Sequence, residues 1–191
     1  MSNPLDAITW PRRTDRLLLR RATGDDVGRI GEIRAFDGVS DWLTVDATDR
    51  DRFDEHFRRP DRLATAIVIA LDGTLIGDLM FRAENAWAQA EVADAAVGSQ
   101  AEIGWVLDPA HAGHGYATEA VDGLLRIGFE ELGVRRIVAY CFADNDASWR
   151  LMERVGMRRE THTRSDSLHR SGRWLDGYGY AILADDWRRD R

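Results

Sequence analysis

The stretch from Glu102 to Ala120 constrains the fold of this chain more than any other. It reads as an apolar run, 103–107, then Asp-Pro, then the glycine turn Gly113-His114-Gly115 and a helical pattern. This order predicts a strand, a tight turn and the start of a helix. Glycine lets a ligand approach the backbone closely, and the first amides of a helix lack acceptors within it. The stretch therefore predicts an anion-binding turn.

Two common phosphate-binding motifs do not fit this turn. No Lys-Ser or Lys-Thr follows the glycines, which excludes a P-loop for nucleoside triphosphate and magnesium. In a dinucleotide-binding fingerprint the third small position would fall on Thr118, and the next expected strand has no acidic residue for a ribose. A helix start that simply needs glycine remains an alternative interpretation.

A second pattern follows further along the chain. Asn145-Asp146-Ala147-Ser148 precedes an apolar-periodic stretch that stops at Gly156-Met157, which predicts a helix over 147–155. Asn145 and Ser148 are residue types that cap helices, so a capping role is open for either.

Length and patterning predict one domain over residues 1–191. The fraction of hydrophobic residues, 44%, is typical of a globular chain. The elements follow the order β-α-α-β-β-β-α-β-α-β-β, an α/β fold with a mixed sheet. We expect strands at 17–20, 63–71, 75–81, 101–107 and 137–142, helices at 25–36, 50–57, 116–132 and 147–155, and a final hairpin ending near Leu183.

Charge and hydropathy limit the partners. The formal net charge is −7, and acidity argues against nonspecific nucleic-acid binding while favouring cationic partners such as amines. The apolar runs are too short to span a bilayer, and the N-terminus lacks the basic and apolar segments of a signal peptide. We expect a cytoplasmic protein that binds neither nucleic acid nor membrane.

Cysteine and histidine give no sign of a metal site. Cys141 is the only cysteine, and its position in an expected buried strand favours a small core residue over a catalytic thiol. The five histidines lack the spacings typical of zinc sites, so no metal is expected.

The glycine turn and the Asn145-x-x-Ser148 pattern together resemble the acyl-CoA site of the GNAT N-acetyltransferases, most closely the RimJ/RimL type. Thr14 to Arg20 is similar to the first strand of that type, and Gly113 to Ala120 to its G-x-G-Y-A-T-E-A segment. Gly172 to Asp176 resembles the final hairpin. The likeness runs from about Arg12 to Trp187. Departures are Ala110 for Gln or Arg, Ala112 for an aromatic residue, Met157 for Phe, and an alanine-rich insertion at 86–97.

The resemblance implies a GNAT fold with a mixed, mostly antiparallel sheet of six to seven strands and about four helices. It implies acetyl-CoA as co-substrate, with the pantetheine arm paired to a strand edge and the pyrophosphate held by backbone amides. The residues assigned to acetyl-CoA on this basis are Trp105, Val106, Leu107, Ala112, Gly113, His114, Gly115, Tyr116, Ala117, Thr118, Asn145, Leu151 and Arg154.

The implied reaction is direct acyl transfer from a thioester to an amine. An α-amine with a pKa of ~8 costs less to deprotonate at neutral pH than a lysine at ~10.4. Glu102, just ahead of the pantetheine strand, is our first candidate for the base, with Asp166 and His169 as weaker ones and a solvated strand-end carboxylate as the alternative. Ser148 occupies the position that donates a proton to the leaving thiolate, with Tyr116 and Tyr140 as alternatives.

The predicted function is an acetyl-CoA-dependent N-acetyltransferase acting on a protein N-terminus or a small amine. Two alternatives stay open: a non-catalytic acyl-CoA-binding sensor or scaffold, and more remotely a dinucleotide-binding domain. The first two helices and the final hairpin, with Arg34, Trp42 and 162–174, are where the resemblance implies acceptor contacts. A homodimer is an open alternative to a monomer.

Overall fold

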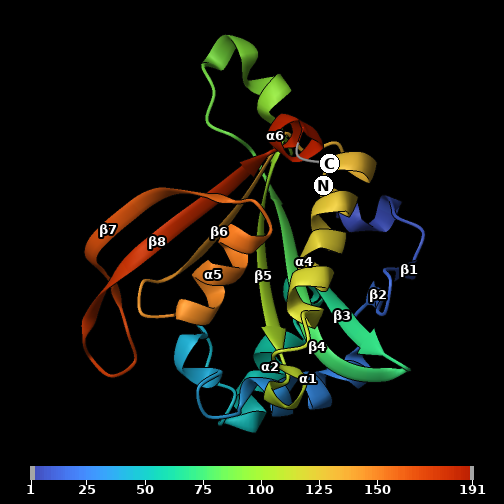
Figure 1. The fold of residues 1–191 in the computed structure, drawn as a ribbon, viewed down its shortest axis with the longest axis vertical. Helices are drawn as coiled ribbons and strands as arrows, with labels where there is room; N and C mark the ends of the chain where they lie inside the picture. The colour runs from blue at the N-terminus through green and yellow to red at the C-terminus, as the bar shows by residue number, and fades with distance from the viewer. Residues whose placement is uncertain (1–2, 190–191) are drawn as a thin grey trace. The chain divides into compact units, whose positions relative to one another are not determined.

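The computed structural model describes residues 3–189 (Figure 1). They form two compact units. Unit 1 contains the described residues up to Phe81 together with Trp105–Leu124, and unit 2 contains Arg82–Gly104 and the described residues from Leu125 onward. Strands β4 (Thr74–Glu84) and β5 (Gln100–Leu107) each contribute to both units. The expectation of a single domain over 1–191 stays a prediction.

Unit 1 is a sheet covered by short helices. Its strands follow the order β1 (Arg12–Arg13), β2 (Leu18–Arg21), β3 (Ala66–Leu71), β4 and β5. The pairs β1–β2, β2–β3 and β3–β4 are antiparallel. Beside them lie α1 (Val27–Arg34), α2 (Arg50–Phe57), α3 (Pro60–Leu63) and most of α4 (Tyr116–Arg126). Because β3 is apolar at every position, it is buried along nearly its whole length.

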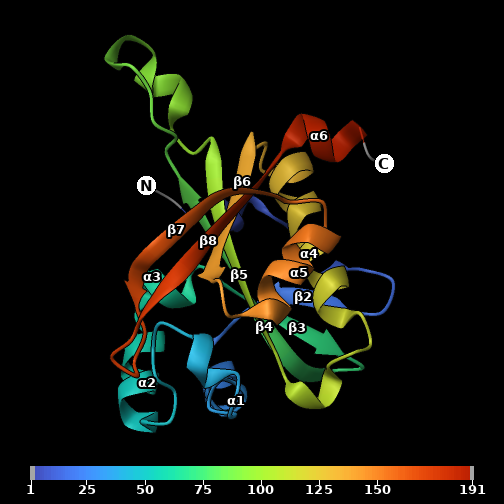
Figure 2. The ribbon, with the colours of Figure 1, turned by 60° about the vertical axis from the view of Figure 1, so that its left-hand side comes forward.

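Unit 2 is built around the last two strands. Its strand order is β4, β5, β6 (Arg136–Phe142), β8 (Trp174–Leu183) and β7 (Arg158–Leu168). The β5–β6 pair is parallel, whereas β8 runs antiparallel to both of its neighbours. Helices α5 (Asp146–Arg154) and α6 (Ala184–Arg189) complete the unit (Figure 2).

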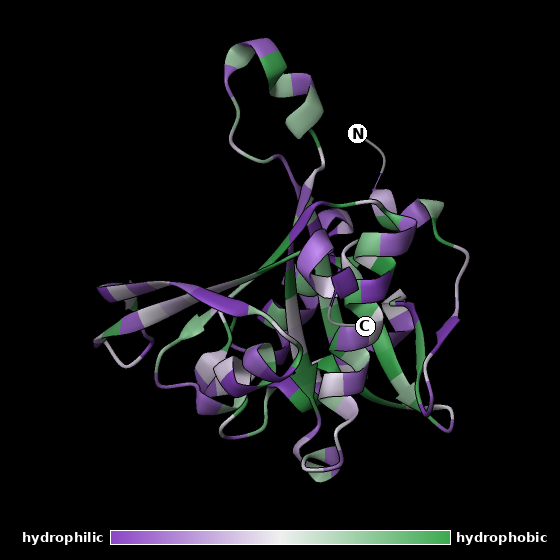
Figure 3. Ribbon diagram, turned by 45° about the horizontal axis from the view of Figure 1, so that its top comes forward, coloured by the Kyte–Doolittle hydropathy of each residue, from purple (hydrophilic) through white to green (hydrophobic). Residues whose placement is uncertain are grey.

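The β7–β8 hairpin differs from the other strands in polarity. Nearly every residue of β7 is exposed, and the hydropathy colouring shows the hairpin largely in purple and white, at the left of Figure 3. The segment between β4 and β5, expected as an insertion, holds a short 3-10 helix, Ala90–Ala96, with no buried residue. Strand β7 and the segment between β4 and β5 are therefore largely exposed to solvent.

The expected α/β fold with a mixed sheet is confirmed, with corrections in detail. With β4 and β5 counted once, the described residues hold eight strands, not six to seven, and six α-helices, not about four. The extra elements are β1, α3 and α6, which are too short to show a hydrophobic period. Helix 50–57 is confirmed, and helix 116–132 is α4 continued by a π-helical turn at Ile127–Glu131. No helix in residues 3–189 is long and apolar enough to cross a membrane.

Candidate functional site

The glycine loop of unit 1 is held at its start by a buried aspartate. Asp108, 3% exposed, follows β5 and caps the 3-10 helix Pro109–His111 by accepting the Ala110 N–H at 2.9 Å. Its other carboxylate oxygen lies 2.5 Å from the Arg29 guanidinium of α1. A buried carboxylate with two partners, an amide and a guanidinium, is costly to displace. Asp108 therefore fixes the path of the chain into the loop.

The loop itself is exposed and needs glycine. Gly113 and Gly115 have φ of +79° and +80°, in the left-handed region that L residues adopt at a cost. A Cβ added at Gly113 would meet no protein atom within 4 Å. The Glu119 N–H donates to the Gly115 carbonyl at 3.0 Å, so the amides of 113–117 lie before this bond at the start of α4. This geometry suits a phosphate approaching the backbone from solvent.

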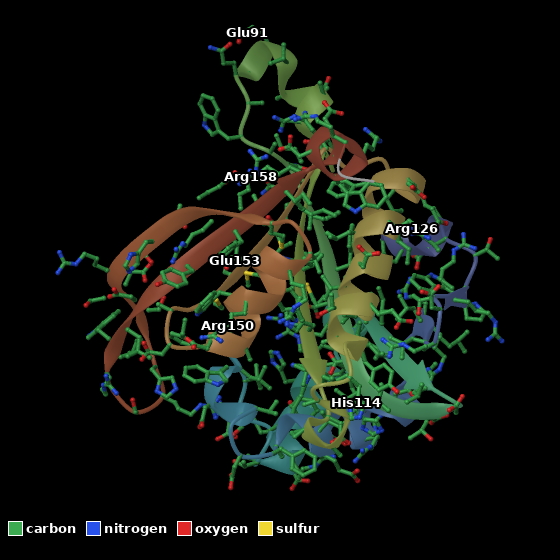
Figure 4. The ribbon with its side chains drawn as sticks, in the orientation of Figure 1. Glu91, His114, Arg126, Arg150, Glu153 and Arg158 are labelled. Carbon is green, nitrogen blue, oxygen red and sulfur yellow. The ribbon has the colours of Figure 1, made fainter. Side chains whose placement is uncertain are left out.

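Arg16 braces this loop, a contact that the sequence did not indicate. Its Nη1 donates to the His114 carbonyl at 3.0 Å, and its guanidinium carbon lies 4.6 Å from the centroid of the Tyr116 ring. Its Nε donates to Glu119 at 2.7 Å. Arg16 lies 98 residues before His114, so no spacing pattern could connect them. Arg16 therefore adds positive charge beside the loop that carries His114. Figure 4 labels His114 in this loop.

Glu119 ties Arg16 to the helix. Burial raises the pKa of this carboxyl group, but hydrogen bonds from Thr14 and Arg16 more than offset that, so its pKa is lower than usual. Glu119 is therefore ionised near neutral pH and holds Arg16 in place. Within unit 1 the structure thus brings together the predicted loop residues Ala112 to Ala117, and it supplies a cation that was not predicted.

The predicted pantetheine strand is β5. Val106 is buried, while Trp105 and Leu107 are half-buried. In unit 2, the parallel register with β6 covers only Gln100, Ala101 and Glu102. Among the described residues of that unit, Ile103 and Gly104 follow without a partner on β6 in this register. A strand that leaves its neighbour in this way presents backbone groups to an amide-bearing ligand.

The start of α5 in unit 2 places Asn145 and Ser148 together. The Asn145 side chain accepts the Ser148 N–H at 3.2 Å, so of the two residues for which a capping role was open, Asn145 is the N-cap. The Ser148 side chain hydrogen-bonds Cys141 of β6. Burial raises the pKa of the Cys141 thiol to about 11, and the bond from Ser148 offsets this only in part. Cys141 is half-buried rather than a core residue, because it lies at the end of β6 under the start of α5.

The rest of α5 is anchored to the sheet. Leu151 is 5% exposed and belongs to the interior, whereas Arg154 is exposed at the end of the helix. Tyr180 of β8 donates its hydroxyl to Glu153 at 2.9 Å. The helix therefore packs on the face of the sheet that carries Tyr180 and Cys141. The roles assigned to Leu151 and Arg154 toward acetyl-CoA stay predictions.

Glu102 is engaged by a neighbouring arginine. Its carboxylate is bonded to Arg82 of β4, which also contacts Glu84. Burial raises the pKa of Glu102, an effect that the charge of Arg82 opposes. Glu102 pairs with Val138, and successive residues of β6 point to opposite faces, so Glu102 and Cys141 lie on opposite faces of the unit 2 sheet. The role of Glu102 as base stays a prediction.

Two residues expected to contact the acceptor, Arg34 and Trp42, differ in their surroundings. Arg34 of α1 forms a bidentate pair with Asp78 of β4, which is 1% exposed. Arg34 therefore neutralises a buried carboxylate. Trp42 is half-buried. Residues 3–189 contain no group of three or more His, Cys, Asp or Glu that could hold a metal ion.

Residues 16–158 match the acetyltransferase (GNAT) domain family. The chain is 42% identical over 86 residues to the uncharacterized N-acetyltransferase YnaD of Bacillus subtilis, which is 45% of this chain and 50% of that protein. It is 28% identical over 178 residues to the uncharacterized N-acetyltransferase YoaA of the same organism, 89% and 94% of the two chains. The chain thus spans half the length of YnaD in that match.

Solved structures share the fold. A GNAT-family acetyltransferase from Bacillus anthracis superposes with a TM-score of 0.72 at 29% identity, covering 92% of this chain and 99% of that one. Mycobacterium smegmatis RimJ in complex with CoA-disulfide has a TM-score of 0.70 at 24% identity, covering 93% and 87%, a likeness of fold alone. The shared fold and the matched family define the class of protein, one that carries an acetyltransferase (GNAT) domain. The chain belongs to the GNAT acetyltransferase family.

Proposed function

We propose that this protein transfers an acetyl group from acetyl-CoA directly to a primary amine, either a protein N-terminal α-amine or a small amine. The observation that carries the proposal is the exposed loop at Gly113 and Gly115, where two left-handed glycines lead into α4 with Arg16 alongside. Backbone amides and one guanidinium supply what a pyrophosphate requires, without a metal. Membership of the GNAT family supports acetyl-CoA as the donor.

Within that family we propose the RimJ/RimL type, supported by the Thr14 to Arg20 and Gly113 to Ala120 segments. The amides of 113–117 would hold the pyrophosphate, and the backbone of Trp105 to Leu107 the pantetheine. Asn145 would bind the pantetheine through the side-chain donors that its cap leaves available. Ser148 would return a proton to the departing thiolate.

The acceptor amine must lose a proton before it attacks. At pH 7 an α-amine at ~8 has a larger neutral fraction than a lysine at ~10.4, so a protein N-terminus is the better acceptor in the absence of strong substrate positioning. We expect a peptide with a free N-terminus to outperform an acetylated peptide that carries one lysine.

The experiment combines binding and turnover. Calorimetry with CoA tests the loop, and release of CoA thiol with peptides, polyamines, amino acids and aminoglycosides tests the reaction. Binding in the micromolar range together with release for at least one amine supports the proposal. Tight binding with no release for any amine would favour a non-catalytic acyl-CoA-binding module instead, and a melting temperature raised by NAD but not by CoA would contradict both.

A further inference from the structure

The β7–β8 hairpin carries a histidine that a carboxylate holds in place. The Nε2 atom of His162 lies 2.8 Å from Oδ2 of Asp176, and Oδ1 of Asp176 accepts the Ser165 N–H at 2.9 Å. Ser165 has a φ of 48°, inside the register shift between Thr163 and Ser167. A serine in this region is strained, and such strain is typical of bulges beside functional groups. The bulge thus directs an amide at Asp176, and Asp176 orients the imidazole.

This arrangement leaves one ring nitrogen of His162 as a proton acceptor. The bond from the Ser165 amide and that from His162 hold the pKa of Asp176 below its usual range, so the carboxylate is ionised near neutral pH. An ionised carboxylate only accepts hydrogen bonds, so Nε2 carries the proton of the neutral imidazole and Nδ1 carries the lone pair. The His162 side chain is 51% exposed and open to a substrate.

The register places His162 on the same face of the sheet as Ser148. His162 pairs with Tyr178 on β8, and Tyr178 pairs with Cys141 on β6, so the three side chains form a row across one face. Cys141 hydrogen-bonds Ser148 of α5. With strands about 4.8 Å apart, the Cα atoms of His162 and Cys141 are separated by roughly 10 Å. Glu102 lies on the opposite face of this sheet.

The charged and titratable groups around His162 come from the hairpin and from β6. Tyr178 contacts the imidazole edge to face, with ring centroids 5.0 Å apart, and the Arg159 guanidinium lies 4.5 Å over the Tyr178 ring. Arg164 adds positive charge beside Asp176. Cys141 completes the row with a thiol that stays protonated at neutral pH. Asp176 is the carboxylate in direct contact with the ring.

We propose that His162, oriented by Asp176, is the general base that removes a proton from the acceptor ammonium, directly or through one water. This inference rests on the proposed function, because it takes Ser148 to mark the position of the thioester sulfur. Its motivation is geometric: an oriented imidazole with a free lone pair shares one face with Ser148, whereas Glu102 is held by Arg82 on the other.

The ammonium gives one proton to Nδ1 of His162, and the neutral amine attacks the thioester carbonyl carbon. The C–N bond forms and the C–S bond breaks. The second proton of the nitrogen goes to the departing thiolate through Ser148, and His162 returns its proton to water. The products are the amide, the CoA thiol and one proton.

The experiment compares pH–rate profiles of thiol release for wild type and variants with one peptide that has a free N-terminus. We expect His162→Gln to leave the dissociation constant of CoA unchanged and to lower kcat by about 100-fold or more, most strongly at low pH where free amine is scarce. Added imidazole should restore part of the rate to His162→Gly. Arg158→Gln, at the exposed start of the same strand, is the matched control and should keep the wild-type profile.

The variant Asp176→Asn tests whether Asp176 orients the His162 ring or only stabilises the hairpin. Loss of the carboxylate should change the tautomer of the His162 ring, seen by nitrogen-15 NMR without any substrate, and should lower kcat with little change in KM. An unchanged ring spectrum would overturn the role of Asp176.

Three outcomes decide the role of His162. A wild-type pH profile and rate in His162→Gln would overturn the assignment and leave the proposed function intact. If Glu102→Gln loses the rate at low pH and His162→Gln does not, the assignment of His162 is overturned in favour of Glu102. CoA binding without thiol release by the wild type for any amine would overturn the proposed function itself and this inference with it.

Discussion

Gly113→Val should weaken CoA binding far more than it weakens the fold. A side chain at Gly113 meets no protein atom within 4 Å, so the variant loses no packing and the cost to the fold is that of an L residue at φ +79°. That cost is about 1–2 kcal/mol, which for a chain of this length corresponds to a melting temperature lower by roughly 2–8 °C. Differential scanning calorimetry measures it.

The cost to binding arises on the solvent side of the loop. The valine side chain would occupy the space from which phosphate oxygens reach the amides, so at least one hydrogen bond to a charged oxygen is lost. Such a bond contributes about 1.5–3 kcal/mol, and 1.4 kcal/mol is a factor of ten in affinity. We therefore expect the dissociation constant of CoA to rise by about 10- to 100-fold, measured by titration calorimetry below the melting temperature of the variant.

Gly73→Val provides the matched control. Gly73 lies between β3 and β4 with a φ of +82° and open space around its Cβ, so valine there costs the fold a similar amount but touches no ligand. Equal CoA affinities in the two variants, with equal losses of melting temperature, would refute the assignment of the loop. Gly113→Ala replaces the valine variant if that one does not fold.

Three further predictions concern unit 1 and unit 2 separately. Hydrogen bonds from Arg20 hold the pKa of Asp26 below its usual value, so this pair stabilises the fold above the unfolded-state pKa of Asp26, and the stabilisation is lost as pH falls through the folded-state pKa. Asp26→Asn should therefore lower the melting temperature at pH 7 and approach the wild-type melting temperature in acid. A difference in melting temperature that stays constant with pH would contradict this. Gly179→Ala would place a Cβ 2.4 Å from Oγ1 of Thr161, so denaturant unfolding should show a loss of about 1–3 kcal/mol that Thr161→Ala partly restores; additive losses would argue against the clash. Asn145→Ala should cost about 1 kcal/mol as a lost cap and also raise KM for acetyl-CoA in steady-state kinetics, and a stability loss without a change in KM would leave only the cap.

Elements with a strong local signal were predictable from the chain alone. Helix α2 was expected over 50–57 and lies there, because Asp49 is a capping residue and Phe53 and Phe57 recur at the helical period. The glycine loop and the Asn145 cap were also predictable, since a left-handed glycine and an N-cap are determined by a few neighbouring residues. Elements of two to six residues, such as β1 and α6, were missed because a hydrophobic period needs a longer window.

Contacts between distant residues were decided by the tertiary structure. The chain shows Glu102 beside an expected pantetheine strand, but only the pairing of β4 with β5 places Arg82 on its carboxylate. The chain also shows five histidines without a distinguishing pattern, and only the pairing of β7 with β8 brings Asp176 to His162. Strand pairing brings together residues that are far apart in the sequence. How far apart they are depends on the lengths of the loops between them, and no local sequence rule fixes those lengths.

The sequence by itself therefore determined the family, the turn that suits a pyrophosphate and the helix cap near the expected thioester, because each depends on backbone chemistry within a few residues. The tertiary structure decided which charges surround those groups. Arg16 beside the loop, Arg82 on Glu102 and Asp176 on His162 all depend on cross-strand or strand-to-helix packing. Electrostatic surroundings are set by distances in space, so the choice of a base depends on the fold.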